Sequence, residues 1–356
     1  MLESMIKQFK EFLSNFIPTE AARLFAPLIL VAIIFAICVM TGLALVKKKK
    51  IKKNTFAFYM FISPWLIGFL VFTVYPVIFS FIISFFKWDI VSPKQFVGLS
   101  NYIRAFSGED KWFYKSLQVT IQYTIFSVPL QLALGFGIAL LINRKMRGVK
   151  VFRTLFYIPT LVSGVALSAL WLHMFNYNFG LLNKTLNLFG ITSQKWLTDA
   201  NLVIPSFVLM SLWGIGGNMV ICLAGLQDIP QDINEAAAID GAGIWQKFKN
   251  ITVPIMSPII FFNLINGVIG SFQTFTQSYI MTEGGPNGAS MFYVLNLYNQ
   301  AFSNFRMGYG SALAWILFAI ILLFTCCIFK SSSMWVYYET EIGNTKIKKK
   351  KGGKAK

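Results

Sequence analysis

Long uninterrupted apolar stretches are the feature that most limits how this chain can fold. Seven of them are each long enough to cross a bilayer, because a hydrocarbon core of about 30 Å needs about 20 apolar residues of helix. Membrane β-barrels use shorter, alternating segments instead. The sequence therefore predicts an all-α polytopic membrane protein. The stretches run over residues 26–46, 58–86, 117–142, 151–175, 202–227, 257–281 and 309–330.

Charge placement indicates how the chain lies in the membrane. Hydrophobic residues make up 56% of the 356 residues and charged residues only 13%, whereas the net charge is +18. Basic residues near helix ends mark the cytoplasmic face, and most of the 32 lysines and arginines flank alternate connections. We therefore expect the N-terminus outside, the C-terminus in the cytoplasm and no nucleic-acid partner. The basic clusters are 47–53, 144–153, 247–249, Lys330 and Lys346–Lys356.

Three regions follow from this pattern. Residues 1–53 form an N-terminal extension with an extra helix and a lysine run, residues 54–330 form the membrane body, and residues 331–356 form a basic cytoplasmic tail. The helix at 26–46 could be a signal peptide, but its length and the lysines that follow favour a retained span. The four cysteines lie in apolar helices and are interpreted as small hydrophobic residues: Cys38, Cys222, Cys326 and Cys327.

The chemistry of an energy-coupling enzyme is missing from the sequence. No Asp or Glu lies within the seven stretches, and ion-driven carriers need ionisable groups at depth. There is no phosphate-binding loop, catalytic triad or metal-ligand cluster. We expect neither a catalytic site nor a cofactor in this chain, and energy must come from a partner.

A polar loop between two apolar stretches carries the most specific motif. Glu235, Ala236 and Ala237 open it, Gly241 follows at a fixed spacing, and residues 251–254 close it with the sequence ITVP. This pattern resembles the EAA loop of ABC importer permeases, with Val253 where that family usually has Leu. The alternative is an ordinary surface connection.

The loop itself reads as two short helices with a bend between them. Residues 231–239 and 244–250 are the helices, Gly241 and Gly243 supply the bend, and Pro254 starts the next membrane helix. The resemblance implies that the region 228–254 docks on an ATPase subunit. The predicted coupling residues are Glu235, Ala236, Ala237, Asp240, Gly241 and Pro254.

The two helices beside this loop are predicted to contact the substrate. The helix after the loop carries amides and hydroxyls that are costly against lipid, and the helix before it is rich in glycine. In maltose-type permeases these two helices hold the sugar. The alternative is close packing between helices through small residues. The predicted pathway residues are Trp213, Gly214, Gly217, Asn218, Gly270, Ser271, Gln273 and Thr274.

Residues 284–286 form a Gly-Gly-Pro turn where sugar-type permeases carry one. The resemblance therefore implies a type I core of six helices, with one extra N-terminal helix, in the membrane subunit of a bacterial plasma-membrane sugar or oligosaccharide importer. It further implies a second homologous permease, two ATPase subunits that bind ATP and Mg, and an extracellular solute-binding protein. Alternatives are another solute (glycerol phosphate, an amino acid or a peptide) or a membrane channel or scaffold.

Overall fold

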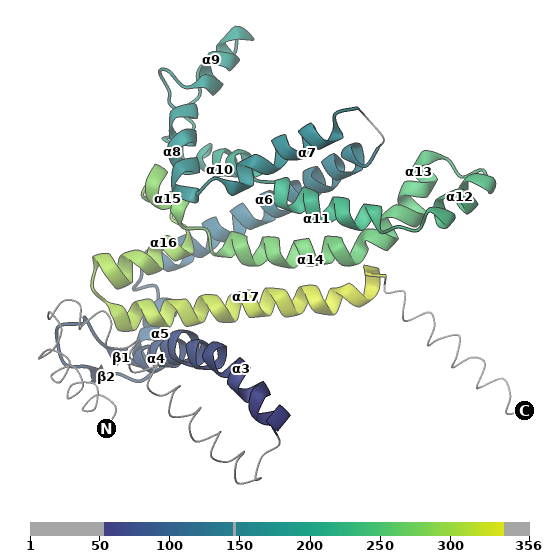
Figure 1. Ribbon diagram of the computed structural model, residues 1–356. Coiled ribbons are helices and arrows are strands. Elements are labelled where there is room, and N and C mark those ends of the chain that lie inside the picture. Colours follow the sequence, from purple (N-terminus) through teal and green to yellow (C-terminus); the bar gives the residue numbers. More distant parts are fainter. Residues whose placement is uncertain (1–52, 145–146, 338–356) are drawn as a thin grey trace, which may run out of the picture. The chain divides into compact units, whose positions relative to one another are not determined.

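The computed structural model describes residues 53–144 and 147–337 (Figure 1). The predicted helix at 26–46 and the C-terminal lysine run lie outside the described residues. The chain divides into two units, residues 1–82 and 83–356, and each is considered by itself.

The described part of the first unit forms one apolar helix. It consists of α3 (Lys53–Phe69), a π-helical turn η1 (Leu70–Val74) and α4 (Tyr75–Ile83). Residues 57–83 form a candidate membrane span in which only 6% of the apolar window is buried. Such a surface suits a lipid or protein environment rather than water.

Where the structure describes it, the second unit is helical apart from one two-stranded hairpin in which Phe86 pairs with Phe96. Its elements up to residue 227 are β1 (Phe86–Lys87), β2 (Gln95–Phe96), α5 (Ser100–Phe106), α6 (Phe113–Ile142), α7 (Val149–Tyr157), η2 (Ile158–Leu161), α8 (Gly164–Met174), α9 (Leu181–Leu188), α10 (Val203–Leu212) and α11 (Gly216–Gln227). The remaining elements are α12 (Gln231–Ile239), α13 (Ile244–Lys247), η3 (Phe248–Thr252), α14 (Val253–Phe272), α15 (Thr276–Met281), α16 (Tyr293–Tyr298), η4 (Asn299–Ser303) and α17 (Met307–Trp335).

The described residues contain four helices long and apolar enough to cross a membrane, or six if each of two bent pairs is one span. The four are 57–83, 113–142, 244–281 and 307–335. The sequence predicted six spans in this part of the chain. Hydropathy located all six, but two of them are broken.

The first bent pair changes direction by 101° between α7–η2 and α8. Pro159 lies in the 3₁₀ turn η2, and Val162 is extended, with φ −75° and ψ 132°. Ser163 then caps α8 by accepting a hydrogen bond from the Ala166 N–H at 3.4 Å. The predicted span at 151–175 is therefore a bent pair of helices, because a proline, an extended residue and a new N-cap end one helix and begin another.

The second bent pair, α10 and α11, turns by 45°. Its position is fixed by a close contact between α11 and α7, because a Cβ at Gly216 would lie 2.2 Å from the Phe156 carbonyl oxygen. Only glycine allows the two backbones to approach this closely.

Helix α6 is the centre of the packing, in contact with α10, α11, α14 and α16. Two of its buried hydroxyls bind neighbouring elements: Thr120 Oγ1 accepts the Tyr293 N–H at 2.9 Å, and Thr124 Oγ1 lies 2.9 Å from Ser271 Oγ. Buried polar groups destabilise a fold unless they are paired. These bonds therefore fix the register of α6 against α16 and α14.

A buried carboxylate joins the start of α6 to the C-terminal helices. Asp110 is 4% exposed. It accepts hydrogen bonds from the Tyr309 hydroxyl at 2.7 Å, the Asn296 amide at 3.1 Å and the Trp112 N–H at 2.9 Å. Three donors satisfy a group that is expensive to bury alone.

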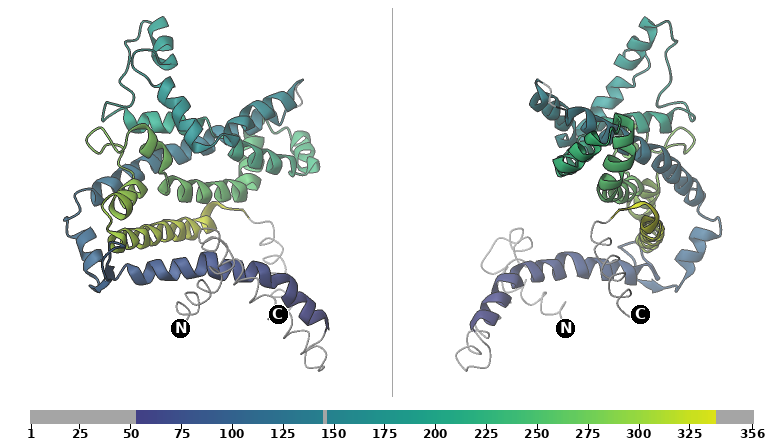
Figure 2. Two further views of the ribbon diagram at one scale, coloured as in Figure 1. Left: turned by 60° about the vertical axis from the view of Figure 1, so that its left-hand side comes forward. Right: turned by 90° about the vertical axis from the view of Figure 1, so that its right-hand side faces the viewer.

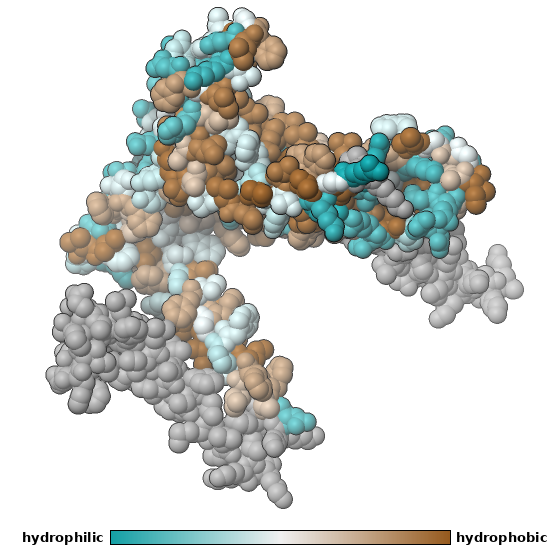
Figure 3. Space-filling view, turned by 45° about the horizontal axis from the view of Figure 1, so that its top comes forward, coloured by the Kyte–Doolittle hydropathy of each residue, from teal (hydrophilic) through white to brown (hydrophobic). Residues whose placement is uncertain are grey.

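The two ends of the second unit differ in character. Helices α12 and α13 lie at one end, and α15 and α16 lie at the other (Figures 1 and 2). Hydrophilic side chains gather over the end with α12 and α13, while apolar side chains cover the helices beside it (Figure 3).

Candidate transport pathway and coupling loop

The polar loop folds into a helical hairpin, called here the coupling hairpin (Gln231–Lys247). Its first helix ends in a glycine cap: the Gly241 N–H donates to the Ala238 carbonyl at 3.1 Å, and the Ala242 N–H to the Ala237 carbonyl at 2.9 Å. Gly241 has φ +74°, a conformation that disfavours any residue with a Cβ. Gly243 is extended, with φ −67° and ψ 167°, so the predicted need for glycine in the bend applies to Gly241 alone.

Polar contacts hold the two helices of the coupling hairpin together. The Lys247 ammonium donates to the Asn234 carbonyl at 3.2 Å, which bridges α13 and α12. Within α12, the Gln231 amide donates to Glu235 Oε1 at 2.7 Å. Glu235 is exposed and has a carboxylate oxygen left for a partner.

The coupling hairpin exposes large apolar side chains. Ile239 is 87% exposed, Ile244 83% and Trp245 71%. Exposed apolar clusters on an otherwise polar surface mark protein contacts. The sequence-based coupling set did not include these three residues, although large apolar side chains inside a polar loop were a visible signal.

The coupling hairpin continues into a membrane helix without a break. Helix α13 passes through the π-helical turn η3 into α14. Pro254 is the second residue of α14 and so lies at the start of that helix, as predicted, although the helical path continues into it from η3. A proline inside a helix lacks an N–H and clashes with the carbonyl four residues earlier, and the wider π turn just before Pro254 relieves that conflict.

A cavity of about 380 Å³, called here the mid-span cavity, lies between α6, α10, α11 and α14. Tyr123 and Gln131 of α6 line it on either side of the midpoint of that helix, so it lies near the centre of the span. No charged residue is among the described residues that line it. These are Tyr123, Gln131, Leu167, Phe207, Met210, Ser211, Gly214, Asn218, Asn266, Gly267, Gly270, Ser271, Thr274 and Gln277.

Five of the eight predicted pathway residues line the mid-span cavity: Gly214, Asn218, Gly270, Ser271 and Thr274. The other three are placed elsewhere. Trp213 packs edge to face against Trp171, with ring centroids 5.8 Å apart. Gln273 lines a different cleft, beside α17, and Gly217 is not among the residues that line the cavity.

Helix α6 supplies a wall of the cavity that the sequence analysis missed. Tyr123, Ser127 and Gln131 are spaced by four residues and share one face of α6. The four-residue spacing of Tyr123, Ser127 and Gln131 could have revealed this polar face of α6. These residues lie within a stretch dominated by apolar residues, which hid the pattern.

The glycines and polar groups of α14 divide between packing and open space. A Cβ at Gly267 would lie 3.1 Å from Val128, so Gly267 serves packing, whereas no described atom lies within 4 Å of a Cβ at Gly270. The Ser271 hydroxyl donates a hydrogen bond to the Thr124 hydroxyl, and Asn266 is exposed. Amides, hydroxyls and an aromatic ring around an uncharged cavity suit a neutral hydroxylated ligand.

Bent and straight membrane helices, a polar mid-span cavity and a projecting helical hairpin define a multi-span membrane permease. The chain belongs to the family of binding-protein-dependent transport system inner membrane components, which its residues 131–334 match.

Named relatives cover most of the chain. The probable ABC transporter permease protein YesP of Bacillus subtilis is 41% identical over 302 residues, which cover 84% of this chain and 97% of the relative. The trehalose/maltose transport system permease protein MalF of Thermococcus litoralis is 36% identical over 275 residues, covering 76% of this chain and 92% of the relative.

Solved structures share the fold. A chain of a bacterial ABC transporter involved in alginate import superposes with a TM-score of 0.71 at 21% identity, covering 80% of this chain and 98% of that chain. A chain of a bacterial alginate transporter in complex with a pentasaccharide-bound periplasmic protein gives a TM-score of 0.70 at 20% identity, covering 79% and 95%. The expected ABC permease fold is therefore confirmed.

Proposed function

We propose that this chain is one of two membrane subunits of an ATP-driven importer for a neutral sugar or oligosaccharide. The observation that carries the proposal is the continuous helical segment 244–272, formed by α13, η3 and α14. It bears the exposed residues Ile244 and Trp245 at one end and, about 30–40 Å further along at 1.5 Å per residue, the cavity residues of α14. A movement at the coupling hairpin is thereby transmitted directly to the wall of the cavity.

The substrate class rests on the cavity and on the relatives. An uncharged lining favours a neutral ligand over an acidic one. The Thermococcus litoralis relative is a trehalose/maltose permease. A protein of Thermoanaerobacterium thermosulfurigenes, 31% identical over 276 residues, is a probable permease for starch degradation products. Glycerol phosphate, an amino acid or a peptide is the alternative solute class.

Energy enters through partner ATPases in this proposal. The exposed residues Ile239, Ile244 and Trp245 of the coupling hairpin seat in a cleft on an ATPase subunit, and Glu235 pairs with a basic group there. ATP and Mg bind on those subunits. ATP binding favours one of two arrangements of the membrane subunits and hydrolysis restores the other, which exposes the cavity to each side in turn.

The remaining partners follow from the same proposal. A second homologous permease completes the pathway, and an external solute-binding protein delivers the sugar to the end that bears α15 and α16. The end that bears α12 and α13 faces the cytoplasm, because it carries basic residues and these concentrate on the cytoplasmic side of membrane proteins. Residues 1–53 are an extension outside the transport core. The predicted boundary of the basic tail at residue 331 is too early, because α17 continues to Trp335 and the family match to residue 334.

Reconstitution tests the proposed function. The chain, its second permease, two ATPases and the binding protein are placed in liposomes, and uptake of labelled neutral oligosaccharides is measured with and without internal ATP. ATP-dependent uptake is expected. ATP-independent flux would indicate a channel, and no flux of any solute would indicate a scaffold.

Replacing Trp245 by Asp tests the docking contact. A buried Trp at an interface contributes about 2 kcal/mol or more to binding. The affinity of this chain for the ATPase subunit should therefore fall about 30-fold or more. Tyr177→Asp is the matched control, because Tyr177 is an exposed aromatic residue of the segment between α8 and α9. Equal loss in both variants would contradict docking through the coupling hairpin.

A further inference from the structure

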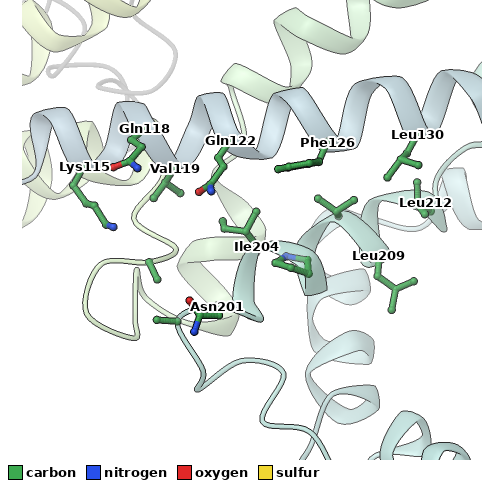
Figure 4. A pocket seen from close by; sticks show the side chains of 14 residues that line it. Lys115, Gln118, Val119, Gln122, Phe126, Leu130, Asn201, Ile204, Leu209 and Leu212 are labelled. Carbon is green, nitrogen blue, oxygen red and sulfur yellow. The ribbon is translucent and has the colours of Figure 1, made fainter.

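A second cleft lies between α6 and α10, separate from the mid-span cavity (Figure 4). Its volume is about 650 Å³, and it shares no lining residue with the mid-span cavity. The face of α6 that carries Gln122 and Phe126 lines this cleft, whereas the neighbouring face, with Tyr123, lines the mid-span cavity.

The cleft is polar at one end and apolar at the other. Lys115, Gln118, Gln122 and Asn201 lie toward the start of α6 and α10. The lining further along consists of apolar side chains, and no acidic residue is among the described residues that form it. The apolar lining includes Phe126, Leu130, Leu209 and Leu212.

The polar side chains of α6 lack protein partners. Lys115, Gln118 and Gln122 are exposed, and their side chains make no hydrogen bond to any residue that the structure describes. An unpaired amide within a membrane span is costly against hydrocarbon. These groups therefore require an occupant that offers hydrogen-bond acceptors at their depth.

Depth along α6 identifies the occupant. A helix of 30 residues is about 45 Å long and exceeds a bilayer core of about 30 Å by about 7 Å at each end. Lys115 then lies at the headgroup level and Gln118 near the boundary of the core. Gln122 lies about 6 Å inside the core, and the apolar part of the cleft follows the direction of the acyl chains.

We infer that this cleft binds an anionic phospholipid from the leaflet opposite the coupling hairpin. Lys115 pairs with the phosphate, which also accepts hydrogen bonds from Gln118 and Asn201. The Gln122 amide donates to an ester carbonyl of the glycerol backbone, which satisfies a group that is otherwise unpaired at this depth. One acyl chain then packs along Phe126 and the leucines beyond it.

The test measures lipid retained by the purified, assembled transporter with native mass spectrometry, after addition of phosphatidylglycerol or phosphatidylcholine with identical acyl chains. Phosphatidylglycerol should be retained preferentially, and higher salt should weaken its retention. Lys115→Gln should lower its retention about fivefold, which corresponds to ~1 kcal/mol for one lysine beside an anionic headgroup. Leu209→Trp, which fills the apolar end, should lower the retention of both lipids.

Two control variants separate this site from general surface effects. Lys195→Gln removes an exposed lysine outside the cleft, and Leu323→Trp enlarges an exposed leucine on α17. Both should leave retention unchanged. Equal retention of the two lipids by the unmodified protein, or unchanged retention in Lys115→Gln and Leu209→Trp, would overturn the inference. So would crosslinking of a Gln122→Cys variant to the second permease, because the cleft would then be a protein interface.

Discussion

Gly241 is the residue at which the coupling hairpin is most sensitive to a small change. Its φ of +74° and its two capping hydrogen bonds make the turn between α12 and α13. No described atom lies within 4 Å of the position that a Cβ would take. Any loss caused by substitution therefore comes from backbone conformation, without a steric clash.

The expected magnitude follows from that geometry. A left-handed conformation costs an ordinary residue about 1–2 kcal/mol, and a β-branched residue is disfavoured further. Gly241→Val should shift the equilibrium away from the formed hairpin by about 5- to 30-fold. Gly241→Asn should have a smaller effect, because Asn tolerates this conformation.

The assay is ATPase activity of the reconstituted transporter, stimulated by the loaded binding protein. Stimulation should fall in the order Asn, Ala, Val at position 241. Gly243→Ala is the matched control, because the backbone of Gly243 is extended and its nearest atom would be 3.9 Å from a Cβ. Full stimulation in Gly241→Val, or equal inhibition in Gly243→Ala, would refute the reasoning.

Three further predictions concern the membrane body. Gly270→Leu should fill open space in the mid-span cavity and abolish uptake without loss of thermal stability. Gly137→Leu, also in open space but on α6 away from the cavity, should transport normally. Equal uptake by both variants would place the pathway elsewhere. Impermeant thiol reagents added from outside should label a cysteine at Glu283 but not one at Asn234, and the reverse pattern would invert the proposed orientation. Asp110→Ala should lower stability in detergent by about 1–3 kcal/mol, because three buried donors lose their acceptor; an unchanged melting temperature would contradict that role.

Local signals made the coupling hairpin predictable. The helix 231–239 was located to the residue because its end depends on a glycine cap, which is set by a few neighbouring residues. The polar face of α14 was equally accessible, since amides and hydroxyls in an apolar helix must avoid lipid. Gly270, Ser271 and Thr274 were therefore placed on the cavity.

Features that depend on tertiary packing were not predictable in the same way. Hydropathy reports the length of an apolar stretch and not its direction, so the 101° turn before α8 was missed. Trp213 follows Leu212, the last residue of α10, and its direction depends on the contact with Trp171. Tyr123 and Gln131 became cavity residues only when α6 was packed against α10 and α14.

The most direct test of the account is the access to the mid-span cavity in each nucleotide state. Asn266 is replaced by Cys in a chain without its native cysteines, and its reaction with an impermeant thiol reagent is measured from each side of the membrane. The account predicts that ATP bound to the partner ATPases lowers reactivity from the side of the coupling hairpin and raises it from the opposite side. Reactivity that is the same with and without ATP on both sides would contradict the claim that the helical segment 244–272 couples the coupling hairpin to the cavity.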